Sequence, residues 1–168
     1  MSSQKSSLQK QLEQEKFLHG IAYVQNASIG IKKLTTAELA YLNQLLTQQN
    51  EEPWRLNPTE VVIPSGQRLQ FNLISNPVAQ ARDILGNAFV TAGNDQVIEA
   101  AVDLYSQLVL NHLFKDANRR TAVLATIWLL NSNGIQVDPQ KLHDIPLGNL
   151  RDKANVHSLA AKIEACKI

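Results

Sequence analysis

The segment from Ala122 to Leu130 constrains the fold more than any other part of the chain, because Thr126 is its only polar residue. A helix that is apolar on every face lies buried inside a domain. The segment is also far shorter than the roughly 20 apolar residues that are needed to cross a bilayer. We therefore predict a central buried helix at about 118–132, with Gly134 as its C-terminal stop, and no membrane-spanning segment.

Apolar residues at helical spacing continue on both sides of this segment. They predict further helices at about 8–18, 36–49, 78–88, 95–111, 139–144 and 156–166. We expect Gly20 to interrupt the first of these. An alternating pattern around the turn residues Pro64-Ser65-Gly66 predicts a β-hairpin, with strands at about 60–63 and 67–71. The expected architecture is all-α with one small hairpin.

The same reading predicts how the chain is divided. Residues 1–7 are polar and are expected to form a flexible tail, because they contain no apolar stripe. Residues 8–168 are expected to form a single domain, whose core spans about 35–138.

The charge balance is close to neutral, with 16 Lys+Arg against 15 Asp+Glu. This balance argues against a protein that binds nucleic acid or an anionic membrane through bulk charge. Cys166 is the only cysteine, which excludes a disulfide framework and a cysteine-based zinc site. The N-terminus lacks the apolar core of a secretory signal peptide. We expect a cytoplasmic protein, although secretion as an effector through another kind of signal leaves no trace in these patterns.

Five chemically useful side chains lie between two apolar helices: His112, Asp116, Asn118, Arg119 and Arg120. A helix that begins near Asn118 offers unpaired N–H groups and its positive dipole end to an anion, and the two arginines add charge there. One carboxylate together with substrate phosphates is a usual way to hold Mg²⁺, which suits Asp116. A neutral imidazole beside a phosphate site is a candidate general base. The combination indicates phosphoryl or nucleotidyl transfer.

Each of these residues also has an ordinary structural explanation. A single buried histidine is usually a hydrogen-bonded core residue, a single Asp or Asn is usually a helix cap, and an arginine pair is usually solvated. The structural explanations do not account for all five at this spacing. The alternatives to an enzyme are a non-catalytic module that binds an anion at the helix N-terminus and an ordinary helical protein.

The segment from His112 to Arg120 closely resembles the signature of the Fic/Doc family, His-x-Phe-x-(Asp/Glu/Asn)-(Gly/Ala)-Asn-(Gly/Lys)-Arg. The matching residues are His112, Phe114, Asp116, Ala117, Asn118 and Arg120. The resemblance covers about 60–138 well, and it implies a Fic/Doc-like helical bundle around the central helix, with the hairpin as the family's flap.

The resemblance implies that His112 deprotonates a Ser, Thr or Tyr hydroxyl of a target protein, and that Asp116 holds Mg²⁺. The phosphates of ATP or another nucleoside triphosphate would be bound by Ala117, Asn118, Arg119 and Arg120. Phe114 would anchor the loop in the core.

The hairpin would act as the flap that aligns a target segment by strand addition, with Ile63, Ser65 and Gly66 at its turn. The family also contains a restraining helix with the pattern (Ser/Thr)-x-x-x-Glu-(Gly/Asn). The only candidate here is Thr47–Glu51, which is followed by Glu52 and Pro53. Without such a helix, the resemblance makes a separate antitoxin-like inhibitory protein plausible.

Two departures separate the branches of the family. The AMP-transferring branch usually carries Gly where this chain has Arg119, and a second arginine where it has Val123. The Doc branch carries Lys at the first position, Ala at 117 and no second arginine, so the chain resembles Doc with Lys replaced by Arg. The resemblance therefore favours phosphorylation of a protein hydroxyl, with AMP transfer (AMPylation) as the alternative.

Overall fold

The computed structural model describes residues 5–29, 33–63, 65–71 and 75–168. These residues form helices and a two-stranded sheet in the order α1 Ser7–Ala27, α2 Thr36–Thr47, β1 Thr59–Val62, β2 Arg68–Phe71, α3 Pro77–Gly93, α4 Val97–Asn111, α5 Asn118–Ser132, α6 Pro139–His143 and α7 Lys153–Glu164. The predicted all-α class with one hairpin is confirmed.

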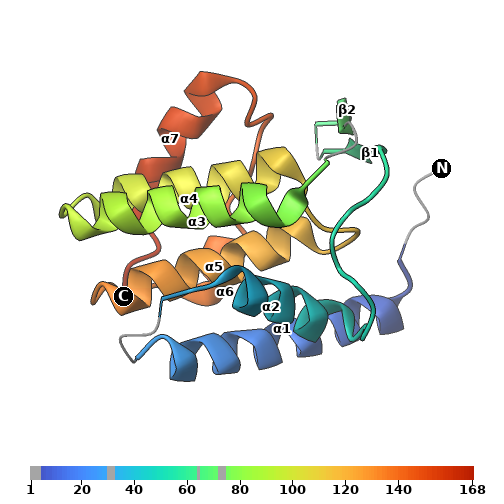
Figure 1. Ribbon diagram of the computed structural model, residues 1–168, viewed down its shortest axis with the longest axis horizontal. Helices are drawn as coiled ribbons and strands as arrows, with labels where there is room; N and C mark the ends of the chain where they lie inside the picture. Colours follow the sequence, from blue (N-terminus) through green and yellow to red (C-terminus); the bar gives the residue numbers. More distant parts are fainter. Residues whose placement is uncertain (1–4, 30–32, 64, 72–74) are drawn as a thin grey trace.

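Helix α5 is the centre of the bundle. Every residue from Thr121 to Leu130 is buried, and Trp128 is fully enclosed. In Figure 1, α5 lies between the α3–α4 pair and the α1–α2 pair, and it contacts α1, α2, α4 and α6. Its bounds are those that the apolar segment predicted, because burial on all sides is what an apolar helix requires.

The prediction that Gly20 interrupts the first helix is wrong. Helix α1 runs without a break through this position, and Gly20 is buried against α5. A Cβ atom at Gly20 would lie 2.7 Å from Leu124 Cδ1. The glycine therefore lets two helices approach closely, and this packing offsets the roughly 1 kcal/mol by which glycine disfavours a helix interior.

The other predicted helices all form, with shifted ends. Helix α3 continues to Gly93, five residues beyond its predicted end, and α7 begins at Lys153 because Asp152 caps it, its side chain accepting from Ala154 N–H. Of the predicted tail at 1–7, residues 1–4 lie outside the described residues, and Ser7 begins α1 with Ser6 as its N-cap.

The hairpin pairs Thr59 with Phe71 and Val61 with Leu69. These four side chains line the pocket described below, whereas Arg68 and Glu60 form an exposed ion pair of 3.1 Å. Within the turn, Gly66 has a φ of 87°, a left-handed conformation that glycine adopts without strain. Pro64, which was predicted in this turn, lies outside the described residues.

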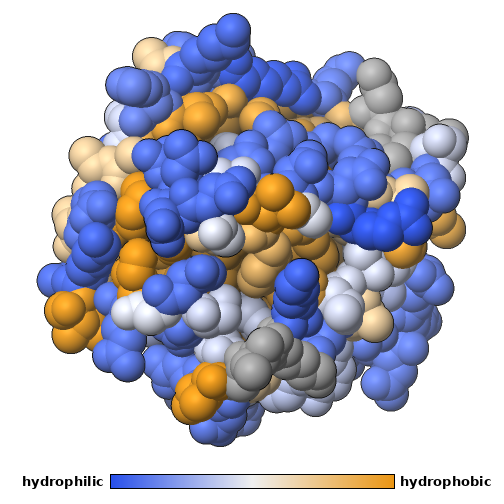
Figure 2. Space-filling view, turned by 60° about the vertical axis from the view of Figure 1, so that its left-hand side comes forward, coloured by the Kyte–Doolittle hydropathy of each residue, from blue (hydrophilic) through white to orange (hydrophobic). Residues whose placement is uncertain are grey.

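Polar residues cover most of the protein face shown in Figure 2, with hydrophobic residues visible between them. Across the described ranges, no helix is long and apolar enough to cross a membrane. The apolar residues are concentrated in one core around α5 instead, and Trp54 and Trp128 belong to it.

Candidate active site

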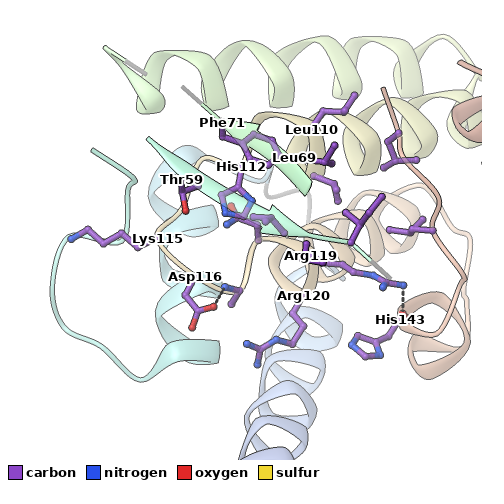
Figure 3. A pocket seen from close by; sticks show the side chains of 18 of the residues that line it. Thr59, Leu69, Phe71, Leu110, His112, Lys115, Asp116, Arg119, Arg120 and His143 are labelled. Carbon is purple, nitrogen blue, oxygen red and sulfur yellow. Dashed lines mark hydrogen bonds between the residues drawn. The ribbon is translucent and has the colours of Figure 1, made fainter. Parts of the chain in front are cut away.

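A pocket of about 580 Å³ lies beneath the hairpin. Its walls are the hairpin, the end of α4, the 112–117 loop, the start of α5 and the 143–150 segment. His112, Asp116, Arg119 and Arg120 all line it (Figure 3). The structure therefore brings the predicted site residues of the 112–120 segment to one cavity.

The loop that carries these residues begins and ends in a left-handed backbone conformation. His112, the C-cap of α4, has a φ of 47°, and Ala117, the N-cap of α5, has a φ of 57°. Left-handed conformations cost non-glycine residues roughly 1–2 kcal/mol each, so the surrounding contacts must hold them in place. Such strain is typical of functional loops.

The 53–55 segment holds one side of the loop. It pairs with residues 113–115 through two backbone hydrogen bonds of 2.8 and 3.0 Å. Trp54 stacks on Phe114 with 4.7 Å between ring centroids, and Phe114 is 2% exposed. Phe114 thus lies in the core, as expected of a loop anchor.

Two asparagines hold the other side. The Asn118 side chain accepts from Phe114 N–H at 2.9 Å and donates to Phe114 O at 2.9 Å. Asn43 of α2 donates to Asp116 O at 2.8 Å and to Thr121 Oγ1 at 3.0 Å. Because the Asn118 amide faces the loop, its contribution to an anion site is its backbone N–H at the start of α5.

The His112 imidazole is half-buried and stacks on Phe71 of β2, with ring centroids 4.7 Å apart. Burial and the nearby Arg55 cation lower the pKa of the imidazole to about 4, while Asp116 acts in the opposite direction. The ring is therefore neutral at pH 7 and can accept a proton.

Arg55 is a buried cation that adds to the effect of burial on His112. Its guanidinium donates to the carbonyls of His112 at 2.6 Å and Asn57 at 2.8 Å, and to that of Phe71 at 3.4 Å. A cation at the last carbonyls of α4 is favourable for the helix dipole. Arg55 joins the hairpin to the end of α4.

The N-terminus of α5 is open toward the pocket, because its N-cap, Ala117, has no capping side chain. The Nη1 atom of Arg120 is buried and has no hydrogen-bond partner within the described part of the chain. Buried donors are usually paired, so an unpaired guanidinium nitrogen on a residue of the uncapped first turn of α5 fits an anionic ligand.

Asp116 supplies the exposed carboxylate, whose Oδ1 accepts from Ala117 N–H at 2.7 Å. Among the residues that the structure describes, no group of three or more His, Cys, Asp or Glu side chains could hold a metal ion. One carboxylate suits Mg²⁺ when substrate phosphates and water complete its coordination. Asp116 therefore fits this mode of binding, and it does not fit a metal held by protein ligands alone.

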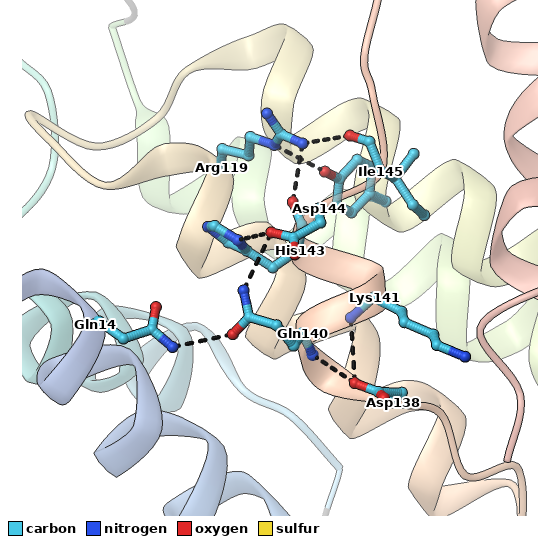
Figure 4. Close-up of polar contacts among 9 residues, drawn as sticks. Gln14, Arg119, Asp138, Gln140, Lys141, His143, Asp144 and Ile145 are labelled. Carbon is cyan, nitrogen blue, oxygen red and sulfur yellow. Dashed lines mark hydrogen bonds and ion pairs between the residues drawn. The ribbon is translucent and has the colours of Figure 1, made fainter. Parts of the chain in front are cut away.

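Arg119 points away from the α5 N-terminus toward α6. Its guanidinium donates to Tyr105 Oη at 3.3 Å, to His143 O at 3.0 Å and to Ile145 O (Figure 4). The Arg119 side chain thus holds the 143–145 backbone against the pocket wall. The spacing of the sequence does not indicate this role.

The three predicted flap residues differ in their surroundings. Ile63 lines the pocket, whereas Ser65 and Gly66 are exposed in the turn at the tip of the hairpin.

The predicted restraining segment, Thr47–Glu51, does not contact the motif arginine through an ion pair. Glu51 is exposed, and among the described residues no ion pair joins it to Arg120. The antitoxin-like partner stays a prediction.

Sequence reasoning missed Arg55 and Asn43. Asn43 carried a signal, because it is a polar residue next to the buried stripe of Leu39, Leu42 and Leu46 in α2. Arg55 carried none, since its contacts with the end of α4 lie 56 and 57 residues away along the chain.

The family model described as "Fic/DOC family" matches residues 33–130, more than half of the chain, and the chain therefore belongs to the Fic/DOC family. The family predicted from the His112–Arg120 motif is confirmed. Its members are generally transferases of nucleotide-derived groups onto proteins, and they generally use a nucleoside triphosphate with Mg²⁺.

Solved structures agree on the fold. A Fic domain containing signaling protein from Bacteroides thetaiotaomicron VPI-5482 matches with a TM-score of 0.69 and 18% identity, covering 99% of this chain and 73% of that one. The N-terminal Fic domain of a Bartonella effector protein from Bartonella sp. AR 15-3 matches with a TM-score of 0.60 and 17% identity, covering 99% and 88%. No curated protein matches the chain.

Proposed function

We propose that this protein transfers a phosphate-containing group from a nucleoside triphosphate to a Ser, Thr or Tyr hydroxyl of a target protein, and that the group is the γ-phosphoryl. The observation that carries the proposal is the buried, unpaired Nη1 of Arg120, a residue in the uncapped first turn of α5 that lines the pocket. A neutral imidazole, that of His112, lines the same pocket.

In the proposed reaction the target hydroxyl oxygen forms a bond to phosphorus, and its proton passes to a ring nitrogen of His112. For phosphoryl transfer, the bond between the γ-phosphorus and the bridging oxygen breaks and the nucleoside diphosphate leaves. For AMP transfer, the bond at the α-phosphorus breaks and pyrophosphate leaves. His112 would serve as the base in both cases, because its imidazole is neutral and lines the pocket.

The phosphates would bind where the fixed positive groups meet. The first N–H groups of α5 and the Arg120 guanidinium are preorganised donors, which stabilise the charge that develops during transfer. Asp116 would hold Mg²⁺, which when bound offsets phosphate charge.

The target would approach along the hairpin. In the pairing register, the backbone N–H and C=O groups of Leu69 and Phe71 point toward β1. Those of Gln70 therefore point to the outer edge of β2. The Arg151 guanidinium already donates to Gln70 O at 2.7 Å. A target strand would therefore add to the outer edge of β1, the strand that carries Thr59 and Val61.

Phosphoryl transfer is favoured by two positions in α5. Arg119 has a Cβ atom where a glycine would let a phosphate approach the backbone more closely, although its guanidinium turns toward α6. Val123 is fully buried in the core and supplies no second cation to the pocket.

The test uses ATP labelled at either the α- or the γ-phosphate, with Mg²⁺ and cell extract as the source of acceptor proteins. We expect γ-label on protein in the wild type and none in His112→Ala. Label from α-ATP would mean AMP transfer instead. No label from either donor, together with retained ATP binding, would identify a non-catalytic anion-binding module.

A further inference from the structure

We propose that Arg151 and Phe71 are positioning residues for His112: the segment before α7 holds β2 through Arg151, and Phe71 of β2 holds the imidazole. This inference rests on the proposed role of His112 as the base. Neither residue belongs to the motif segment, and they reach His112 from two other parts of the chain.

The contact between Phe71 and His112 is a ring stack. The centroids lie 4.7 Å apart and the planes are 23° from parallel. Phe71 is 8% exposed, so its ring is a fixed surface in the pocket wall. Stacking of this kind fixes the tilt of the imidazole plane, which a backbone contact cannot do.

Arg151 in turn fixes Phe71 by two contacts. Its guanidinium carbon lies 5.1 Å from the Phe71 ring centroid, within cation–π range, and its Nη2 donates to Gln70 O at 2.7 Å. Asn149 adds a hydrogen bond of 3.1 Å to the Gln67 side chain. The 149–151 segment therefore contacts β2 and the residue just before it.

Such support is needed because His112 ends α4 in a left-handed conformation and starts a loop. Arg55 holds the His112 carbonyl at 2.6 Å, and this contact fixes the backbone and leaves the ring to Phe71. A base must reach the hydroxyl to within roughly 2.6–3.2 Å, and a displacement of about 1 Å can cost about 100-fold in rate.

The arrangement also links target docking to the base. Phe71 pairs directly with Thr59 of β1, the strand to which the target would add. A target strand on β1 and the Arg151 contact on β2 would therefore hold the two edges of the same hairpin, with His112 stacked on its inner face.

The test compares Arg151→Ala and Arg151→Lys with Arg82→Ala, a matched control. Arg82 is also an exposed arginine, but it lies on α3 and does not line the pocket. We expect Arg151→Ala to lower kcat for label transfer from ATP by about 10- to 100-fold, with KM for ATP within about two-fold. Arg151→Lys, which keeps the cation, should recover much of the loss, and Arg82→Ala should match the wild type.

A second readout does not require transfer. The Phe71 ring current shifts the ring-proton NMR signals of His112, and these signals should move in Arg151→Ala and move further in Phe71→Leu. His112 signals that stay at their wild-type positions in both variants would overturn the positioning role. So would a rise in KM without a fall in kcat, or an equal loss in Arg82→Ala. A wild type that shows the NMR shifts but transfers no label would overturn the proposed function and leave the contact itself supported.

Discussion

Asn118 and Phe114 exchange two hydrogen bonds of 2.9 Å across the turn between them: the Asn118 amide accepts from the Phe114 N–H and donates to the Phe114 carbonyl. The pair closes the loop between the catalytic candidate His112 and the first turn of α5. Because Asn118 is 7% exposed, water cannot readily replace either bond.

Replacement of Asn118 by alanine should therefore loosen the loop. We expect the free energy of unfolding to fall by about 1–3 kcal/mol, because a buried N–H and a buried carbonyl both lose their partner. Label transfer should fall as well, since the strained Ala117 that precedes the helix loses support. Urea denaturation and the label assay measure the two effects, with Asn87→Ala on the exposed face of α3 as the control. Equal stability of both variants would contradict the role of the pair.

His112→Ala should abolish transfer and leave ATP binding within a few-fold of the wild type. The base acts on the incoming hydroxyl, not on the phosphates, and such a base contributes about 10²–10⁴ in rate. Calorimetric titration with Mg-ATP and the label assay separate the two effects. Full activity in this variant would remove His112 from the mechanism.

The stability of the ligand-free protein should depend on the His112 protonation state. Its pKa is about 4 in the folded protein, against 6.5 for the free side chain. Between these pH values the unfolded chain binds more protons than the folded protein. The free energy of unfolding therefore does not depend on the protonation of His112 above about pH 6.5, and it decreases as the pH falls toward 4. For a half-buried ring we expect a loss of about 1–3 kcal/mol across this window.

Urea denaturation at several pH values between 7 and 4 measures this loss. His112→Gln provides the control, because it keeps a polar side chain that does not titrate. The stability of this variant still depends on pH through all the other titratable groups. The difference between the two proteins should appear only below about pH 6.5. Parallel curves for wild type and variant would mean that the folded-state pKa is not depressed.

The elements that the sequence predicted well are those whose signal is local. The bounds of α5 at 118–132 follow from one apolar segment, and the hairpin follows from alternation around a turn. Gly20 was misread because its role depends on Leu124, which is far away in sequence and supplies the packing that keeps α1 continuous. A glycine in a helical pattern marks either a break or a close approach, and local spacing cannot distinguish them.

The site residues that the sequence predicted also lie close together along the chain. The motif placed His112, Asp116 and Arg120 at one pocket because all lie in one loop and the helix that follows it. Arg55 and Arg151 reach that loop or the hairpin from other segments, and their contacts are set by tertiary packing. Arg119 shows the opposite case, since its spacing suggests a phosphate ligand while its guanidinium donates to the carbonyls of His143 and Ile145.

Asp116→Ala should remove most of the Mg²⁺ dependence of ATP binding, because it deletes the loop carboxylate. The Asp116 backbone carbonyl would keep its bond to Asn43, so the loop should remain in place. Titration calorimetry with and without Mg²⁺ tests this, with Asp83→Asn on the exposed face of α3 as the charge-matched control. A metal dependence that survives in Asp116→Ala contradicts the assignment.

Arg119→Gly tests which phosphate reaches the pocket. The wild-type side chain borders the first turn of α5 and is held by Tyr105 and the 143–145 backbone. Removing it should destabilise the protein by about 1–3 kcal/mol, through the lost bonds and a glycine in the helix. The loss of the Cβ atom should also let a phosphate approach the α5 N–H groups closely and shift the product from phosphate toward AMP.

Arg119→Ala separates these two effects. It loses the same guanidinium bonds but keeps a Cβ atom beside the helix N-terminus, so it should be destabilised similarly without gaining AMP transfer. Intact-mass analysis of modified acceptor proteins after reaction with Mg-ATP distinguishes the two products. If the wild type already adds AMP efficiently, the phosphoryl-transfer proposal fails. The pocket and its base would then serve the other orientation of the nucleotide, because His112 acts on the hydroxyl whichever phosphorus is attacked.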